Sequence, residues 1–315
     1  MLFKFLTKNK TSLHKSKSFW STFKNAYLKR KNLKKFWLNL DKKNLSPELI
    51  EITELFLNSN SYNLTSKFWR HCLINHYNHI ANVDKNINPL DAILKSDYSG
   101  FTFLDEYSVN ETLKIDYQKI KFDIDIFKKH KNLSNLQSLQ YNIVLLMLYE
   151  NIKNKKIFKY YNDIRTDIYI DYNPYLNIDN KIVTQQMLIS LLEYEKIFSL
   201  IDENNTEPKI LELGAGYGRT ANMILSLKPK TKYVIADLAP TIYFSKKLLT
   251  NSFKDKKIKS AFKINSSKEM MKAFNENDIL FIFPHQLNLF DKKTFDISLS
   301  IGNLCEMEKA QIKNY

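Results

Sequence analysis

The residues best placed to do chemistry in this chain surround a cluster of glycines. Three of the five glycines, Gly214, Gly216 and Gly218, fall within five positions, directly after the buried-strand pattern of residues 209–213. Such glycines allow unusual backbone angles and let the backbone approach a ligand closely. The residues from Thr220 onward have a helical pattern, so the cluster links a strand to a helix. The free N–H groups and the positive helix end at such a turn attract a ligand.

The spacing excludes two common nucleotide-binding motifs. The third glycine of the dinucleotide pattern G-x-G-x-x-G would fall on Arg219, and no Gly-Lys-Ser/Thr triplet follows the turn. What remains is an acidic residue, Glu212, two positions before the first glycine, and a second strand pattern at 232–236 that is followed by Asp237. A carboxylate at that strand end can accept hydrogen bonds from both hydroxyls of a ribose. The alternative is a purely structural strand-to-helix turn in another α/β protein.

The order of these elements resembles the first motif of class I methyltransferases that depend on S-adenosylmethionine (SAM). Three groups of residues narrow the resemblance to sugar O-methyltransferases, a family associated with bacterial surface polysaccharide gene clusters. They are Glu212–Arg219, Lys232–Tyr233 with Asp237–Pro240 and Ser245, and Asn303–Met307. The similarity covers about residues 170–315, and Ala239 stands where the family is expected to have a second proline.

The resemblance implies a SAM site. The glycine turn would pass beneath the methionine part of SAM, Glu212 would meet its ammonium group, Asp237 would hold its ribose, and Leu238 would face its adenine. After the third predicted strand a polar residue is expected to contact the adenine, and after the fourth a residue is expected near the sulfonium. The SAM-binding residues predicted in this way are Glu212, Gly214, Ala215, Gly216, Gly218, Asp237, Leu238, Gln286 and Ser300.

Methyl transfer to an unactivated sugar hydroxyl also requires alignment and a group that takes the hydroxyl proton. His285 and Glu306 follow the predicted strands 279–284 and 295–301, and both are candidate general bases. Histidine has a suitable pKa without tuning. Each residue has a structural alternative, because His285 can be an ordinary loop residue and Glu306 can cap a helix or form an ion pair.

A second cluster of reactive side chains lies on a predicted helix at residues 64–80. Cys72, His76 and His79 share one helical face, and His71 adjoins them. Three such side chains can bind zinc, but a fourth ligand at a usual spacing is missing, so we predict no metal site. Packing is the favoured interpretation. The functional alternative is a helix that faces the substrate, with Trp69 stacking on a sugar ring.

Charge is concentrated at the N-terminus. Residues 1–43 hold thirteen Lys or Arg and one acid, Asp41, which accounts for +12 of the net charge of +15. Aromatic residues recur among the basic ones at helical spacing. We therefore predict a basic amphipathic arm that contacts an anionic membrane surface, or alternatively a helix docked on the body. Only four basic residues of the 48 are Arg, which argues against specific nucleic-acid binding.

The fold class expected is α/β: a Rossmann-like, doubly wound parallel sheet preceded by a mostly helical region. The arm 1–43, a helical acceptor or lid region 44–178, and a SAM-binding domain 179–315 form the predicted organisation. Four strands are predicted where a class I methyltransferase sheet has seven, so we expect truncation at the C-terminus and an open sheet edge that favours oligomers. The predicted strands are 209–213, 232–236, 279–284 and 295–301, and the predicted helices are 47–57, 64–80, 132–153 and 184–201.

Composition sets the compartment. Two distant cysteines, Cys72 and Cys305, form no disulfide framework, and the longest apolar stretch, 143–148, is too short to span a bilayer. We expect a cytoplasmic protein, either free or at the inner membrane face. The function expected is methylation of a sugar hydroxyl in a surface glycan or its precursor. The alternatives are another small-molecule acceptor or RNA, although the Asn/Asp-Pro-Pro-aromatic motif common in nucleobase methyltransferases is missing at 300–303, or a truncated remnant without catalysis.

Overall fold

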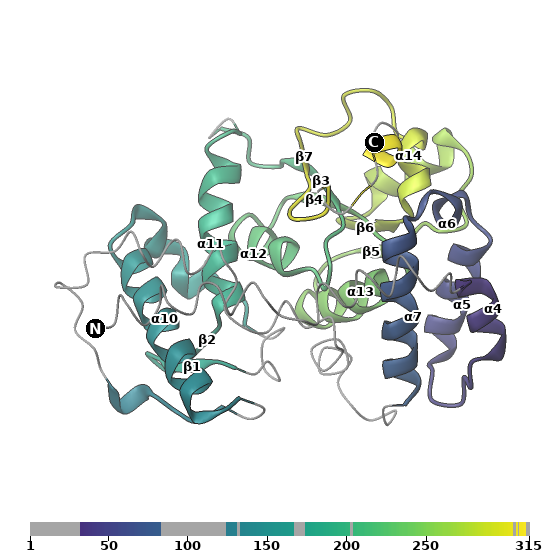
Figure 1. The fold of residues 1–315 in the computed structure, drawn as a ribbon. Coiled ribbons are helices and arrows are strands. Elements are labelled where there is room, and N and C mark those ends of the chain that lie inside the picture. The colour runs from purple at the N-terminus through teal and green to yellow at the C-terminus, as the bar shows by residue number, and fades with distance from the viewer. Residues whose placement is uncertain are drawn as a thin grey trace.

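A parallel β-sheet forms the centre of this protein in a computed structural model (Figure 1), which describes residues 32–82, 124–130, 133–166, 174–201, 204–304, 307 and 309–312. The sheet has five strands in the order β5-β6-β4-β3-β7, and every neighbouring pair is parallel. The strands are β3 (Lys209–Leu213), β4 (Lys232–Ala236), β5 (Ile258–Ser260), β6 (Ile279–Ile282) and β7 (Ile297–Leu299).

Both faces of the sheet are covered, as its hydrophobic strands require. On β4, Tyr233 and Ile235 belong to the core cluster that also contains residues of α11 (Gln185–Phe198), α12 (Arg219–Leu227) and α13 (Thr241–Ser252). The alternate residues Val234 and Ala236 belong to a second cluster with α14 (Ser267–Glu276). This alternation is the two-residue period of a β-strand. The architecture is therefore α/β, with a doubly wound arrangement compatible with a Rossmann-like fold.

The strand order creates a switch point next to β3. From β3 the chain moves to β4 and then to β5 and β6 on the same side, before it crosses to β7 on the other side. Leu213 pairs with Ala236, while Glu212 pairs with Leu299, so three strands end at nearly the same level. Open α/β sheets bind ligands at the carboxyl ends of their strands where the order reverses in this way.

The helices before the sheet lie on two sides of it (Figure 1). Helix α5 (Pro47–Leu57) contacts α13 and α6 (Asn60–Leu64) contacts the 3-10 helix η5 (Pro284–Leu289), whereas α10 (Asn135–Lys153) contacts α11. The described parts of the predicted region 44–178 thus flank the sheet and share its core. The other elements before the sheet are α4 (Leu33–Asn39), α7 (Lys67–Ala81), η2 (Ile124–Ile126), η3 (Lys156–Asp163), and the antiparallel pair β1 (Leu176–Ile178) and β2 (Lys181–Val183). A short helix, α15 (Lys309–Ile312), follows the sheet.

Local signals explain why the helices begin where they do. The Ser46 side chain accepts the N–H of Leu49 at 3.2 Å, and proline occupies the first turn of α5, as its sequence predicts. Ser66 caps α7 in the same way, so the predicted helix 64–80 begins at Lys67, and residues 60–64 form the separate short helix α6. The predicted helices 132–153 and 184–201 are present with shorter ends.

The predicted strands need three corrections. The four-strand count was wrong, because β5 adds a fifth strand whose three residues, with an exposed Lys259, show too little pattern to recognise. The strand predicted at 279–284 ends at Ile282, since Pro284 begins η5. The strand predicted at 295–301 is confined to Ile297–Leu299.

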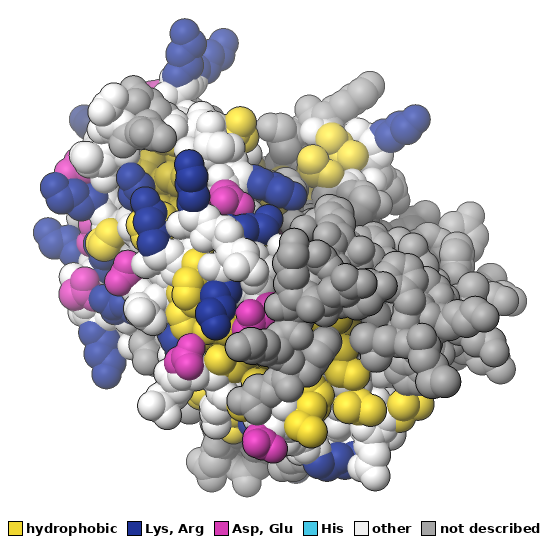
Figure 2. All heavy atoms as spheres, turned by 90° about the vertical axis from the view of Figure 1, so that its left-hand side faces the viewer, with side chains coloured by type: hydrophobic (Ala, Val, Ile, Leu, Met, Phe, Trp, Pro, Cys, Tyr) yellow, Lys and Arg dark blue, Asp and Glu magenta, His cyan; other side chains and the backbone are white. Residues whose placement is uncertain are grey.

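Residues 1–31 of the basic arm lie outside the described part of the chain. Of the arm, α4 is a helix that buries Leu33 and Trp37. None of the described helices is both long and apolar enough to cross a membrane. On the face of the molecule in Figure 2, Lys and Arg side chains of the described residues alternate with Asp, Glu and hydrophobic side chains, so charges of both signs are mixed there.

One aromatic side chain joins the early helices to the sheet, which gives a test of the shared core. Phe283 is fully buried, stacks on Phe262 with ring centroids 4.5 Å apart, and contacts Phe56 of α5 at 5.7 Å. We expect Phe283→Ala to lower the free energy of unfolding by about 3–5 kcal/mol in denaturant titrations, because it leaves a cavity between two elements. Leu200→Ala, at a side chain that is 78% exposed, is the control and should change it by less than about 0.5 kcal/mol. Equal effects would contradict the shared core.

Candidate functional site

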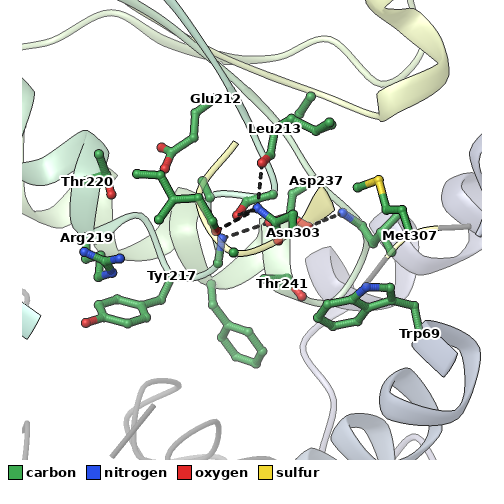
Figure 3. A pocket seen from close by; sticks show the side chains of 18 of the residues that line it. Trp69, Glu212, Leu213, Tyr217, Arg219, Thr220, Asp237, Thr241, Asn303 and Met307 are labelled. Atoms are coloured by element: carbon green, nitrogen blue, oxygen red, sulfur yellow. Dashed lines mark hydrogen bonds between the residues drawn. The ribbon is translucent and has the colours of Figure 1, made fainter. Parts of the chain in front are cut away.

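A cavity opens at the switch point of the sheet (Figure 3). Its wall combines the glycine turn, the ends of β3 and β4, the segment after β7, the starts of α12 and α13, and helix α7. The lining residues are Thr65, Ser66, Trp69, His76, Glu212, Leu213, Gly214, Ala215, Gly216, Tyr217, Arg219, Thr220, Ala236, Asp237, Leu238, Thr241, Phe244, Ile301, Gly302, Asn303 and Met307. The predicted site and the cavity therefore coincide over the glycine turn.

The glycine turn has a backbone that other residues rarely adopt. Gly214, Gly216 and Gly218 all have positive φ angles, of 74°, 60° and 89°. A Cβ atom at Gly214 would lie 2.4–2.5 Å from side-chain atoms of Asn303, whereas one at Gly216 would meet nothing within 4 Å. Gly218 is the N-cap of α12 and packs near Leu249. Gly214 therefore allows close packing against Asn303, Gly216 leaves the cavity wall open, and Gly218 begins helix α12.

Asp237 is held against the glycine turn. Its Oδ2 accepts the backbone N–H of Gly216 at 3.0 Å, and its Oδ1 accepts the N–H of Leu238 at 2.6 Å. The residue is 8% exposed. Burial raises the pKa of Asp237 to about 7, although the two backbone hydrogen bonds favour the ionised form. The carboxyl group is thus fixed in place, and a hydrogen-bond donor or a cation entering the cavity will ionise it.

Glu212 is a second buried carboxyl group in the same wall. It is 2% exposed and accepts the hydroxyl of Tyr233 at 2.8 Å. Burial raises the pKa of Glu212 to about 7, and the bond from Tyr233 and the charge of Arg219 oppose this shift. Two carboxyl groups whose pKa values lie near neutral pH share one cavity, and they favour a ligand that brings positive charge or hydroxyl groups.

The cationic side chain in this wall is already engaged. Arg219 donates to both carboxylate oxygens of Glu193 on α11, at 2.6 and 2.9 Å, and to Ser190 at 2.8 Å. The lining residues within the described part of the chain include no lysine. The described wall of the cavity therefore offers two buried carboxyl groups, Glu212 and Asp237, and one cation that is already paired.

Helix α7 closes the cavity opposite the glycine turn. Trp69 from this helix lies next to Met307, and Thr241 from α13 lies close by (Figure 3). Burial lowers the pKa of His76 to about 4, and the neighbouring His79 adds to this effect, so the imidazole is neutral at physiological pH. Cys72 on the same helix is fully buried. In the described residues, groups of three or more His, Cys, Asp or Glu that could hold a metal do not occur.

The structure brings together most of the predicted SAM-binding residues but not all of them. Glu212, Gly214, Ala215, Gly216, Asp237 and Leu238 line the cavity, and Gly218 supports the turn from behind. Ser300 does not line the cavity, although the next residue, Ile301, does. The buried hydroxyl of Ser300 has no hydrogen-bond partner among the described residues.

The residues predicted after β6 are turned away from the cavity by η5. The Gln286 amide is buried, accepts the N–H of Phe283, and donates to the carbonyls of Ala261 and Ile264. His285 lines a separate polar cavity together with Glu51 and Lys263. Its Nδ1 lies 2.9 Å from the Ser61 hydroxyl oxygen. The other candidate base, Glu306, lies outside the described residues.

Several lining residues received no role from sequence reasoning. Asn303 donates to the carbonyls of Leu213 and Gly214 at 2.8 and 2.9 Å and thereby holds the turn from the β7 side. Its place in the group Asn303–Met307 was the available signal. His76 belonged to the cluster considered for zinc. Tyr217 likewise belonged to the group Glu212–Arg219. Thr241 and Phe244 carried no signal, because their positions depend on how α13 leaves the sheet.

Comparisons of the chain with models of protein families, with curated proteins and with solved structures find no match. The fold stands as α/β with a parallel sheet covered on both faces. The chemistry of the cavity accordingly rests on the carboxyl groups, the glycine turn and the α7 wall described above.

The contact between Gly214 and Asn303 predicts a pairwise effect on stability. Gly214→Ala should lower the free energy of unfolding by about 2–4 kcal/mol, because it combines backbone strain with overlap against Asn303. Gly216→Ala, the matched control, has only the strain and should cost about 1 kcal/mol. Combining Gly214→Ala with Asn303→Ala should cost at least about 1 kcal/mol less than the sum of the two single changes in urea titrations. Additive costs would contradict the contact.

The buried state of Glu212 predicts a pH-dependent stability. The folded protein holds this proton to about pH 7, whereas the unfolded chain releases it near the ordinary glutamate pKa of 4.5, so ionisation destabilises the fold as pH rises from about 5 to 8. Glu212→Gln removes the ionisation and keeps an oxygen for Tyr233. The stability of the variant minus that of wild type should be about 2.5 kcal/mol larger at pH 8 than at pH 5, measured by chemical denaturation. The same difference at both pH values would refute the raised pKa.

Proposed function

We propose that this protein is a SAM-dependent methyltransferase of the class I type. The observation that carries the proposal is the position of Asp237, whose carboxyl group is fixed beside Gly216 at the switch point of the sheet, inside the cavity. A carboxylate at the end of the second strand, next to a glycine turn after the first, matches the site of a ribose in such folds. The turn also leaves room for a ligand at Gly216, where a Cβ atom would meet no other atom within 4 Å.

The charges of the cavity support a cationic adenosine ligand. Glu212 and Asp237 would bind the ammonium group and the ribose of SAM, and Leu238 would lie against its adenine. The bound SAM supplies a methyl group activated by its sulfonium. Arg219 is paired with Glu193, so its positive charge repels a cationic ligand less than the charge of an unpaired arginine would. This charge pattern favours SAM over a phosphate-bearing dinucleotide.

The α7 side of the cavity supports a sugar hydroxyl as the acceptor. Trp69 offers an aromatic face of the kind on which the apolar side of a sugar ring stacks. Thr65 and Ser66 also line the cavity, although the Thr65 hydroxyl donates to the Ser61 carbonyl and the Ser66 hydroxyl accepts the Trp69 backbone N–H. The protein must bring the acceptor oxygen into line with the methyl group, which is a matter of positioning. We therefore propose O-methylation of a sugar hydroxyl in a glycan or its precursor.

Calorimetric titration with SAM and with S-adenosylhomocysteine (SAH) tests the cofactor half of the proposal. We expect micromolar binding of both by the wild-type chain. Asp237→Asn should weaken both by about 10- to 100-fold, because it removes a charged hydrogen-bond acceptor for the ribose. Asp255→Asn, at an exposed acid that pairs with Arg165 at 3.5 Å, is the matched control and should leave both affinities unchanged.

Two outcomes would overturn this proposal. One is a folded wild-type chain that binds neither ligand at millimolar concentration. The other is binding that survives Asp237→Asn undiminished, which would place the ligand away from the cavity at the switch point. Circular dichroism of each variant establishes that it is folded before its affinity is compared.

A further inference from the structure

We propose that His76 is the residue that accepts the proton of the acceptor hydroxyl during methyl transfer. This inference rests on the proposed function, and it assigns the general base to helix α7 rather than to the strand ends. His76 lines the same cavity as Gly216 and Asp237. His285, the histidine expected in that role, faces a different cavity. The geometry thus places an imidazole from α7 in the wall of the cavity that also holds the predicted SAM-binding residues.

The helix places His76 and Trp69 on one stripe. The two residues are seven positions apart, which is close to two turns and about 10 Å along the axis. Both line the cavity, as does Ser66 at the cap of the helix. An acceptor ring that stacks on Trp69 would extend along this stripe. Its hydroxyl groups would then lie between the indole and the imidazole.

The titratable groups around the cavity bear on whether His76 can hold a proton. Among the residues that the structure describes, those in the cavity wall besides His76 are Glu212, Asp237, Tyr217 and the paired Arg219, and His79 lies on the same helix. Burial keeps the imidazole neutral at physiological pH, which is the form that accepts a proton, but the same burial and the neighbouring His79 oppose the imidazolium that forms. The ionised carboxylates of Glu212 and Asp237, which line the same cavity, act in the opposite direction and favour it.

The transfer step balances in charge as well as in atoms. His76 takes the hydroxyl proton on a ring nitrogen while the acceptor oxygen forms its bond to the methyl carbon. The electron pair of the broken carbon–sulfur bond stays on sulfur. One positive charge therefore leaves sulfur and one appears on the imidazole, so the net charge of the buried cavity does not change. In surroundings of low dielectric, this avoids the large cost of creating an uncompensated charge.

Binding of SAM and SAH tests the position of His76 without a known acceptor. The two ligands differ by one methyl group and one positive charge. If His76 faces the transferred methyl group, His76→Arg should raise the ratio of the SAM to the SAH dissociation constant at least 10-fold, and His76→Glu should lower it. His76→Gln, which is neutral, should leave the ratio within 3-fold. Calorimetry at pH 7.5 gives the SAM and SAH dissociation constants of the wild-type chain and of each variant.

His285→Arg is the matched control, since it adds the same charge in the other cavity and should not change the ratio. A measurement on the wild-type chain covers the case in which a charged variant does not fold. In nitrogen-15 spectra of the histidine side chains, the His76 signals should differ more between the SAM and SAH complexes than those of His71, His79, His130 or His285.

The outcomes separate this inference from the proposed function. Failure of wild type to bind either ligand refutes the methyltransferase proposal itself. Binding of both ligands, with His76 signals that are the same in the two complexes, shows that the imidazole lies away from the sulfonium and overturns the role of His76. An unchanged ratio in folded His76→Arg and His76→Glu does the same. Opposite changes in the two charged variants support the role, because a residue that only packs the helix would move both ligands equally.

Discussion

The pairing of β3 with β4 is the constraint on which the site depends. Leu213 lies opposite Ala236, so the residues that follow the two strands, Gly214 and Asp237, emerge at the same level. The backbone N–H of Gly216 then reaches the Asp237 carboxyl group. A shift of the register would separate the glycine turn from its acid, and the hydrophobic alternation on both faces of β4 opposes such a shift.

The same pairing explains the unusual electrostatics of the cavity. Glu212 and Asp237 are carried inward by strands that are buried on both faces, so their carboxyl groups lose the water that would favour ionisation. Hydrogen bonds from Tyr233 and from the backbone keep these groups in place, although burying them lowers the stability of the fold. Buried, strongly shifted carboxyl groups in a cleft are typical of sites where a ligand supplies the missing partner.

The helices before the sheet complete the site from the other side. Phe56 packs against Phe283, and the backbone N–H of His285 donates to Ser61 at 2.9 Å, which fixes α5 and α6 to the end of β6. Because Ser66 caps α7 directly after α6, this docking also determines where Trp69 comes to lie. Residues separated by more than 130 positions in the chain therefore form one cavity.

The sequence by itself determined the part of the site that is local. Glu212, Gly216 and Asp237 could be predicted because each directly ends or follows a strand, and the ends of neighbouring parallel strands meet at one edge. Only the tertiary structure decided the rest. Gln286 also follows a strand, yet η5 turns its amide into the interior, and His76 was one histidine among several until the docking of α7 placed it in the cavity wall. Strand ends obey a short-range rule, whereas the docking of a helix depends on packing between residues far apart in the chain.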